Sequence, residues 1–184
     1  EWGGTTHVLH GGLRAHREWL PSYSVKRSDM TASNFVPRTD SSFRLMSLSA
    51  HIDDTFTPLP NLDVTAGVRA EWIPSVSGND SVSGFTYDDE FFDLLPAFGL
   101  SYSFHPKLAA FANYGEGFRA PQFWGFAYAA NPNDALDFES GRSAEVGLRW
   151  QDWGPVSGSL ALWQLDFDDY LVFDTGYYEN VGAI

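Results

Sequence analysis

Aromatic and polar side chains gather in residues 119–142, in a combination that suits the binding of a small ligand. The candidate contacts in this stretch are Arg119, Gln122, Phe123, Trp124 and Tyr128. Aromatic rings offer rigid apolar contact area, while an arginine and an amide can orient an anionic group through charge-assisted hydrogen bonds. The same rings could instead pack the stretch against the structure beneath it, so both interpretations remain open.

Arg38 is a further candidate contact for an anion. It lies in a polar stretch, residues 18–42, that also carries Lys26 and Arg27. We expect this stretch to be a loop that could present the three cations to a ligand.

The sequence offers weaker grounds for catalysis or metal binding. The acidic runs 79–80 and 88–90 could supply oxygen ligands to calcium, but a hydrated loop is the simpler expectation. The five histidines are dispersed, and His51 with Asp53 has no serine at a spacing that would complete a catalytic triad. We therefore expect no catalytic residue, no cofactor and no metal site.

Composition excludes several classes of protein. The 184 residues carry 24 acidic and 11 basic side chains, and the formal charge of −13 argues against a partner that is a nucleic acid. Hydrophobic residues make up 43% of the chain, too many for a disordered acidic tail. Cysteine is absent, which excludes disulfides and thiolate zinc sites, and no apolar run is long enough for a membrane-spanning helix.

The elements that must position these residues repeat with a period of two. Every even position of 62–72 is apolar, from Leu62 to Trp72, whereas the odd positions hold Asp, Thr, Gly, Arg and Glu. Side chains alternate across a strand, so this pattern predicts one apolar and one polar face. The other segments that alternate, some of them faintly, are 5–17, 43–56, 91–104, 108–118, 143–151 and 156–170. The chain is therefore predicted to be all-β.

The connections indicate how these strands are arranged. Short turns are expected at 57–61, 105–107 and 154–155, and long loops at 18–42, 74–90 and 119–142. Strands joined by hairpins that are tight at one end and long at the other are typical of an antiparallel, up-and-down transmembrane β-barrel. A soluble β-sandwich is the alternative, and Pro96 is expected near a rim or a bulge because proline donates no hydrogen bond to a ladder.

Four motifs in order resemble those of TonB-dependent outer-membrane receptors. Residues 95–102 (LPAFGLSY) and 111–122 (FANYGEGFRAPQ) are similar to one region of this family. Residues 139–149 (ESGRSAEVGLR) and the hairpin that ends in 178–183 (YENVGA) are similar to two further segments. The resemblance covers about half of the chain, and its one departure is Phe138, where the family usually has proline.

The resemblance implies a 22-stranded barrel in the bacterial outer membrane, occluded by an N-terminal plug domain. On this reading residues 1–184 are about seven to eight barrel strands of a longer receptor, without the plug and the C-terminal strands. A complete eight-stranded barrel is the alternative that the chain length alone would allow.

The functional implication is the binding and import of a ferric siderophore or similar iron chelate. The TonB complex would supply energy through regions outside this chain, and outer-membrane lipid would surround the barrel. The motif position of Gln122 faces the vestibule in ferric-citrate-type relatives, which makes it a ligand candidate. A porin-like or adhesin barrel without energised transport is the alternative from another class.

Overall fold

The described part of the chain forms one large antiparallel sheet and one small hairpin. The computed structural model describes residues 5–27, 34–120, 137–174 and 177–182. The sheet strands are β1 (Thr6–Arg27), β2 (Phe35–Leu59), β3 (Leu62–Asp80), β4 (Phe85–His105), β5 (Leu108–Arg119), β6 (Glu139–Trp153) and β7 (Val156–Asp168). The hairpin strands are β8 (Tyr170–Asp174) and β9 (Tyr177–Val181). Within these ranges no helix is long and apolar enough to cross a membrane.

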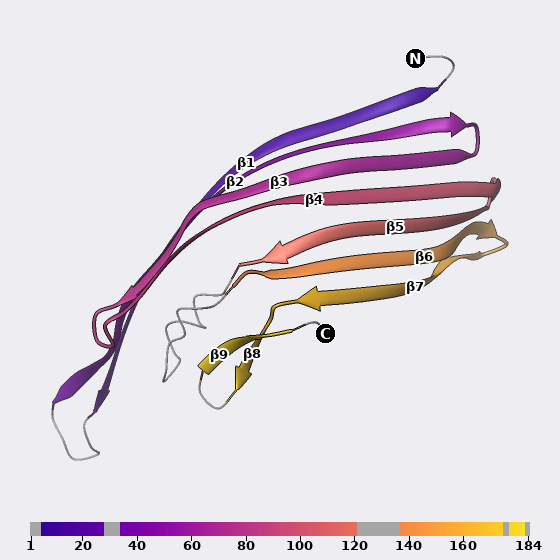
Figure 1. Cartoon of the computed structure of the whole chain (residues 1–184). Helices are drawn as coiled ribbons and strands as arrows, with labels where there is room; N and C mark the ends of the chain where they lie inside the picture. Colours follow the sequence, from indigo (N-terminus) through magenta and orange to yellow (C-terminus); the bar gives the residue numbers. More distant parts are fainter. Residues whose placement is uncertain (1–4, 28–33, 121–136, 175–176, 183–184) are drawn as a thin grey trace.

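Each strand of the large sheet pairs with the next one along the chain, in the order β1 to β7. Figure 1 shows these strands side by side in one curved layer, with β1 and β7 as its two edges. The turns between β2 and β3, β4 and β5, and β6 and β7 are tight and lie at one end of the sheet. The predicted all-β, antiparallel, up-and-down fold is confirmed, as an open part of a barrel wall.

The strand registers join the apolar positions of neighbouring strands into a continuous face. Val68 lies opposite Ile52 on one side and Pro96 on the other, and Val146 lies opposite Leu162. This register also explains β7, whose pattern is untidy, because Leu162 belongs to the apolar face and the exposed Trp163 to the opposite one. We call these two sides of the sheet the apolar face and the polar face.

The height of the apolar face matches a membrane. From Leu62 to Trp72 the even positions span ten residues, or about 33 Å along the strand at about 3.3 Å per residue. At a tilt of about 45° this corresponds to about 23 Å along the membrane normal, close to the apolar band of about 25 Å in outer-membrane barrels. Trp72 and Phe92 end the band on β3 and β4 and remain 47% and 63% exposed, as expected of an aromatic girdle.

The prediction of loops at 18–42 and 74–90 is wrong, because the structure has strands over most of both ranges. β1 continues to Arg27 and β2 begins at Phe35, while β3 and β4 are joined by a short turn at 81–84. Beyond the membrane no face of a strand has to be apolar toward lipid, so the alternation disappears although the backbone ladder continues. Arg38 and Lys26 accordingly lie on paired strands rather than in a loop.

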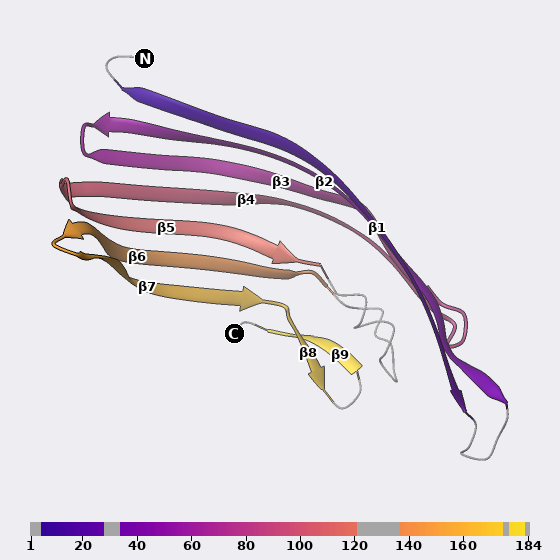
Figure 2. The ribbon, with the colours of Figure 1, turned by 180° about the vertical axis from the view of Figure 1, so that it is seen from behind.

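The sheet divides above the level of Pro96. β4 and β5 pair from the turn up to Ala97 and Gly115, and beyond that point they diverge. Figure 2 shows β1 to β4 bending away from β5 to β7. The expectation that Pro96 lies at a bulge or rim is wrong, because it pairs opposite Val68 within β3–β4. A missing N–H is tolerated there because the pairing of β4 with β5, followed away from the tight turn, stops at Ala97. Pro96 therefore has no partner on β5.

A small hydrophobic core fills the space where the sheet divides. Its buried members are Phe43, Ile73, Val76, Tyr87 and Phe138. The Phe91 ring packs against those of Phe118 and Phe138, with centroids 4.7 and 4.4 Å away, and Leu171 brings β8 to the same cluster. Phe138, the departure from the family motif, is therefore a core residue. Burying each large apolar side chain contributes about 1.5–3 kcal/mol, so this cluster holds the divided ends together.

Candidate functional site

A groove of about 470 Å³ opens at the ends of β5, β6 and β7 that lie away from the tight turns. Its lining includes Gly115, Gly117, Arg119, Glu139, Gly141, Ser143, Leu165, Phe167 and Tyr170. Gly117 pairs with Gly141 and Gly115 with Ser143, so no large side chain covers this part of the sheet. The result is a shallow site with a floor of backbone and small residues and with aromatic walls.

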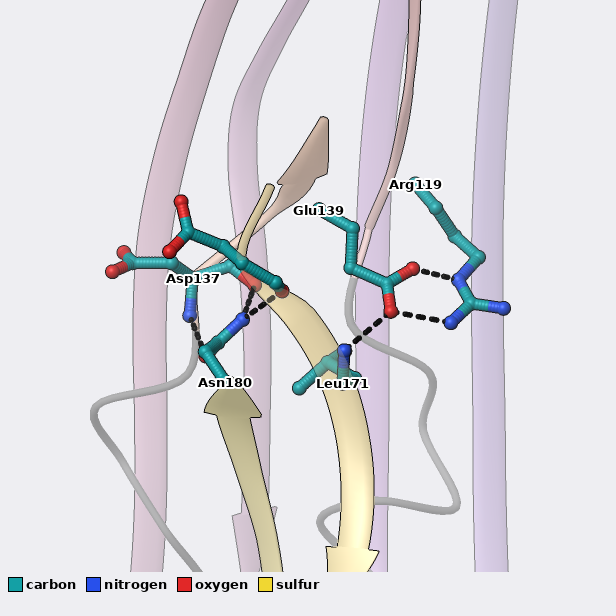
Figure 3. A network of polar contacts seen from close by, with 6 residues as sticks. Arg119, Asp137, Glu139, Leu171 and Asn180 are labelled. Carbon is teal, nitrogen blue, oxygen red and sulfur yellow. Dashed lines mark hydrogen bonds and ion pairs between the residues drawn. The ribbon is translucent and has the colours of Figure 1, made fainter. Parts of the chain in front are cut away.

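The one ion pair in the groove lining joins Arg119 at the end of β5 to Glu139 at the start of β6. These residues are cross-strand partners, and Figure 3 shows the guanidinium facing the carboxylate in a two-bond contact. The Arg119 Nη2 donates to Glu139 Oε1 at 2.5 Å, and Nε donates to Oε2. The Leu171 N–H donates to the same Oε1 at 2.5 Å, so Glu139 also fixes β8.

Burial explains why Glu139 needs these three donors. Its side chain is 2% exposed, and a buried carboxylate is costly unless it is paired and hydrogen-bonded. The hydrogen bond to Glu139 raises the pKa of Arg119, which therefore stays charged. The guanidinium also lies 5.7 Å from the centre of the Tyr170 ring, within the range of a cation–π contact.

The β8–β9 hairpin holds Tyr170 at the edge of the groove. Asn180 Nδ2 donates to the carbonyl oxygens of Asp137 and Asp169, and its Oδ1 accepts from the Asp137 N–H. Figure 3 shows this amide between the two backbone segments. One side chain of β9 therefore ties the hairpin to the start of β6.

Tyr87 is a buried member of the core where the sheet divides. Burial, followed by the neighbouring Asp89, raises the pKa of Tyr87, because both disfavour the phenolate. Its hydroxyl donates to Asp89 at 3.1 Å. Asp89 is thus engaged in a structural hydrogen bond.

The other acidic run also has a structural role. Asp80 accepts hydrogen bonds from the backbone N–H groups of Val82 and Ser83, at 2.9 and 2.8 Å, and so closes the turn between β3 and β4. Among the described residues no group of three or more His, Asp or Glu side chains is arranged to hold a metal ion.

The predicted ligand residues fall into three places. Arg119 lines the groove, whereas Arg38 is exposed on β2, near its pairing with β1. The remaining candidates, Gln122, Phe123, Trp124 and Tyr128, lie outside the described residues. That stretch connects β5 to β6, and both strands reach the groove: β5 ends there at Arg119, and β6 begins there at Glu139.

Sequence reasoning missed Glu139, Phe167 and Tyr170 as parts of the site. The register of β5 and β6 is unbroken from Leu108 opposite Trp150 to Arg119 opposite Glu139, so the pairing was in principle readable from the strand patterns. The position of Tyr170 had no such signal, because it depends on how the hairpin docks.

The fold defines a class of protein, a segment of a transmembrane barrel, and its polar face carries the groove. The groove offers a cation, aromatic rings and backbone, a combination that can bind a ligand. A family model described as TonB dependent receptor-like, beta-barrel, matches residues 2–184. The chain therefore belongs to this family of bacterial outer-membrane receptors and transporters, which is not an enzyme family.

Solved structures of similar fold come from the same class. The ferric citrate transporter FecA in its unliganded form has a TM-score of 0.75 and 18% identity, over 92% of this chain and 26% of that protein. The siderophore receptor PiuA from Acinetobacter baumannii has a TM-score of 0.76 and 15% identity, over 100% of this chain and 32% of its own length. The copper transporter OprC has a TM-score of 0.66 and 15% identity, over 98% and 32%. The chain thus spans between 26% and 32% of these proteins, and the likeness shows the fold alone.

Proposed function

We propose that this chain is part of a receptor that binds and imports a ferric siderophore or a similar iron chelate, energised through the TonB complex. The observation that carries the proposal is the groove at the end of β5–β7, which combines an arginine with aromatic walls on the polar face. Family membership supports this substrate class, as does the similarity in fold to the ferric citrate transporter FecA and the siderophore receptor PiuA.

The chemistry of the groove suits the organic part of such a chelate. Phe167 and Tyr170 offer ring faces to a flat ligand, and the glycine floor allows close approach. Arg119 has five N–H donors and Glu139 occupies two of them, so donors remain for an anionic group. Because Glu139 neutralises much of this charge, we assign the main recognition of the anion to Gln122 and Arg38.

Uptake of radioactive iron by iron-starved cells that express the full-length receptor tests this assignment. Gln122→Ala, Arg38→Ala and Trp124→Ala should each weaken uptake of the cognate chelate while surface expression stays normal. Loss of one charge-assisted hydrogen bond corresponds to about a ten- to hundredfold loss of affinity. Asp88→Ala, an exposed side chain on β4, is the control and should have no effect. Normal uptake in all three variants would remove these residues from the binding site.

The groove itself can be tested by filling it. A Cβ at Gly117 would meet no atom within 4 Å, so the strand can carry a side chain there and Gly117→Trp should place its ring in the groove. Uptake should fall, whereas Ser159→Trp, on the same face of β7 near the tight turns, should leave uptake unchanged. Equal uptake by both variants would show that the ligand does not use the groove.

Energised transport is separable from binding in the same assay. If the TonB complex drives import, an uncoupler that abolishes the proton-motive force should stop uptake but leave binding of the chelate at the cell surface. Uptake that persists would favour the alternative of a porin-like barrel.

A further inference from the structure

A second groove of about 470 Å³ lies on the opposite side of the sheet, over the middle of β1 and β2 and the last part of β3. It is lined by Ala15, His16, Arg17, Arg44, Leu45, Met46, Ser75 and Ser77. The cross-strand pairs place Arg17 next to Met46 and Arg44 next to Trp19, all on the apolar face. This groove therefore opens toward lipid and is separate from the proposed ligand site.

The two arginines lie just beyond the apolar band. The last row of that band joins Ala15, Leu48 and Trp72. Arg17 belongs to the next row and Arg44 to the row after it. Successive rows are two residues apart, or about 7 Å along the strand, so both guanidinium groups lie at the level of the lipid headgroups.

No ion pair among the described residues balances the charge of this site. Neither Arg17 nor Arg44 has an ion-pair partner among the described residues, and the groove lining contains no acidic side chain. Arg142 on the apolar face of β6 differs, because its Nη2 contacts Asp168 at 2.6 Å. Two adjacent unpaired cations in a chain with a formal charge of −13 point to an anionic ligand from outside the chain.

We propose that Arg17 and Arg44 bind a phosphate group of the glycolipid in the outer leaflet of the membrane. Guanidinium groups match phosphate oxygens in a forked geometry, and the hydroxyls of Ser75 and Ser77 add donors to the groove. Trp19, 63% exposed on the same face, suits the boundary between acyl chains and headgroups. The choice of the outer leaflet follows from the tight turns lying on the periplasmic side, as in the barrel class.

Thermal unfolding of the purified full-length receptor in detergent tests the site. The probes are a bis-phosphorylated lipid A, the same lipid without phosphates, and inorganic phosphate. Ligands that bind the folded state raise the unfolding temperature, so the phosphorylated lipid should stabilise the wild type and the other two probes should not. Replacing both residues, Arg17→Gln with Arg44→Gln, should weaken this lipid binding at least about tenfold.

Arg14→Gln is the matched control, because Arg14 is an exposed arginine on the polar face of the same strand. It should respond to the phosphorylated lipid as the wild type does. An undiminished shift in the double variant would overturn the proposal, as would an equal shift with the dephosphorylated lipid. An equal shift with inorganic phosphate would replace the lipid by a free anion as the ligand.

Discussion

A single carboxylate joins three segments of the site that are far apart in the sequence. Glu139 at the start of β6 accepts hydrogen bonds from Arg119 on β5 and from the Leu171 N–H on β8. Because the carboxylate is almost fully buried, water cannot replace either donor. We infer that Glu139 positions Tyr170 for any ligand in the groove.

This role predicts a local change when the carboxylate is removed. In Glu139→Ala the Leu171 N–H loses its acceptor, a charge-assisted bond worth about 1.5–3 kcal/mol. Hydrogen exchange of the Leu171 amide should therefore accelerate about ten- to hundredfold, measured by mass spectrometry on the full-length receptor. Glu145→Ala, on the same strand, should leave this amide unchanged. Equal protection in both variants would contradict the positioning role.

At the scale of elements, one face of each membrane-spanning strand contacts lipid and the other contacts water. Val68 lies halfway along the apolar positions of β3, and Ala97 lies on the polar face of β4 at almost the same depth. Glycines flank Ala97 on both sides, since it pairs with Gly67 and Gly115. An arginine at 97 therefore has both room and water, whereas an arginine at 68 has lipid.

Val68→Arg should accordingly impair assembly, and Ala97→Arg should not. An arginine at the midplane of the lipid face costs about 2–4 kcal/mol in outer-membrane barrels. The folded fraction in outer-membrane preparations, measured by heat-modifiable gel mobility of the full-length receptor, reports the difference. If both variants assembled equally well, the assignment of the apolar face to lipid would be wrong.

At the scale of the whole molecule, the sheet has two unlike ends. The tight turns lie at one end, while at the other β1 to β4 extend beyond the apolar band and a core joins them to β8. Such long strand extensions have no hydrocarbon to span, so they must project into water. In this barrel class the projecting end is extracellular and the tight turns are periplasmic.

Epitope tags test this orientation in intact cells. A tag inserted at Ser83, in the turn between β3 and β4, should be accessible to antibody. A tag at Asn61, in the tight turn between β2 and β3, should be accessible only after the outer membrane is permeabilised. The reverse labelling pattern would invert the orientation and would move the Arg17–Arg44 site to the inner leaflet.

The local sequence pattern was sufficient to predict the seven long strands, because each strand that crosses the membrane alternates apolar and polar side chains. The tight turns also follow from their own residues, Pro58–Asn61 among them. The pattern failed where strands leave the membrane, since the ends of β1 to β4 no longer need an apolar face toward lipid. Arg38 was placed in a loop for this reason.

The candidate site depended on information that no single segment contains. Arg119 was predicted from the aromatic and polar residues of 119–142, but its pairing with Glu139 requires the register across a long connection. The position of Tyr170 requires the docking of the hairpin. The lipid-side groove likewise exists only because β1, β2 and β3 align Arg17 and Arg44 in adjacent rows. Local sequence therefore determines which residues form strands. The register of the hydrogen-bonded ladders determines which side chains meet to form a site.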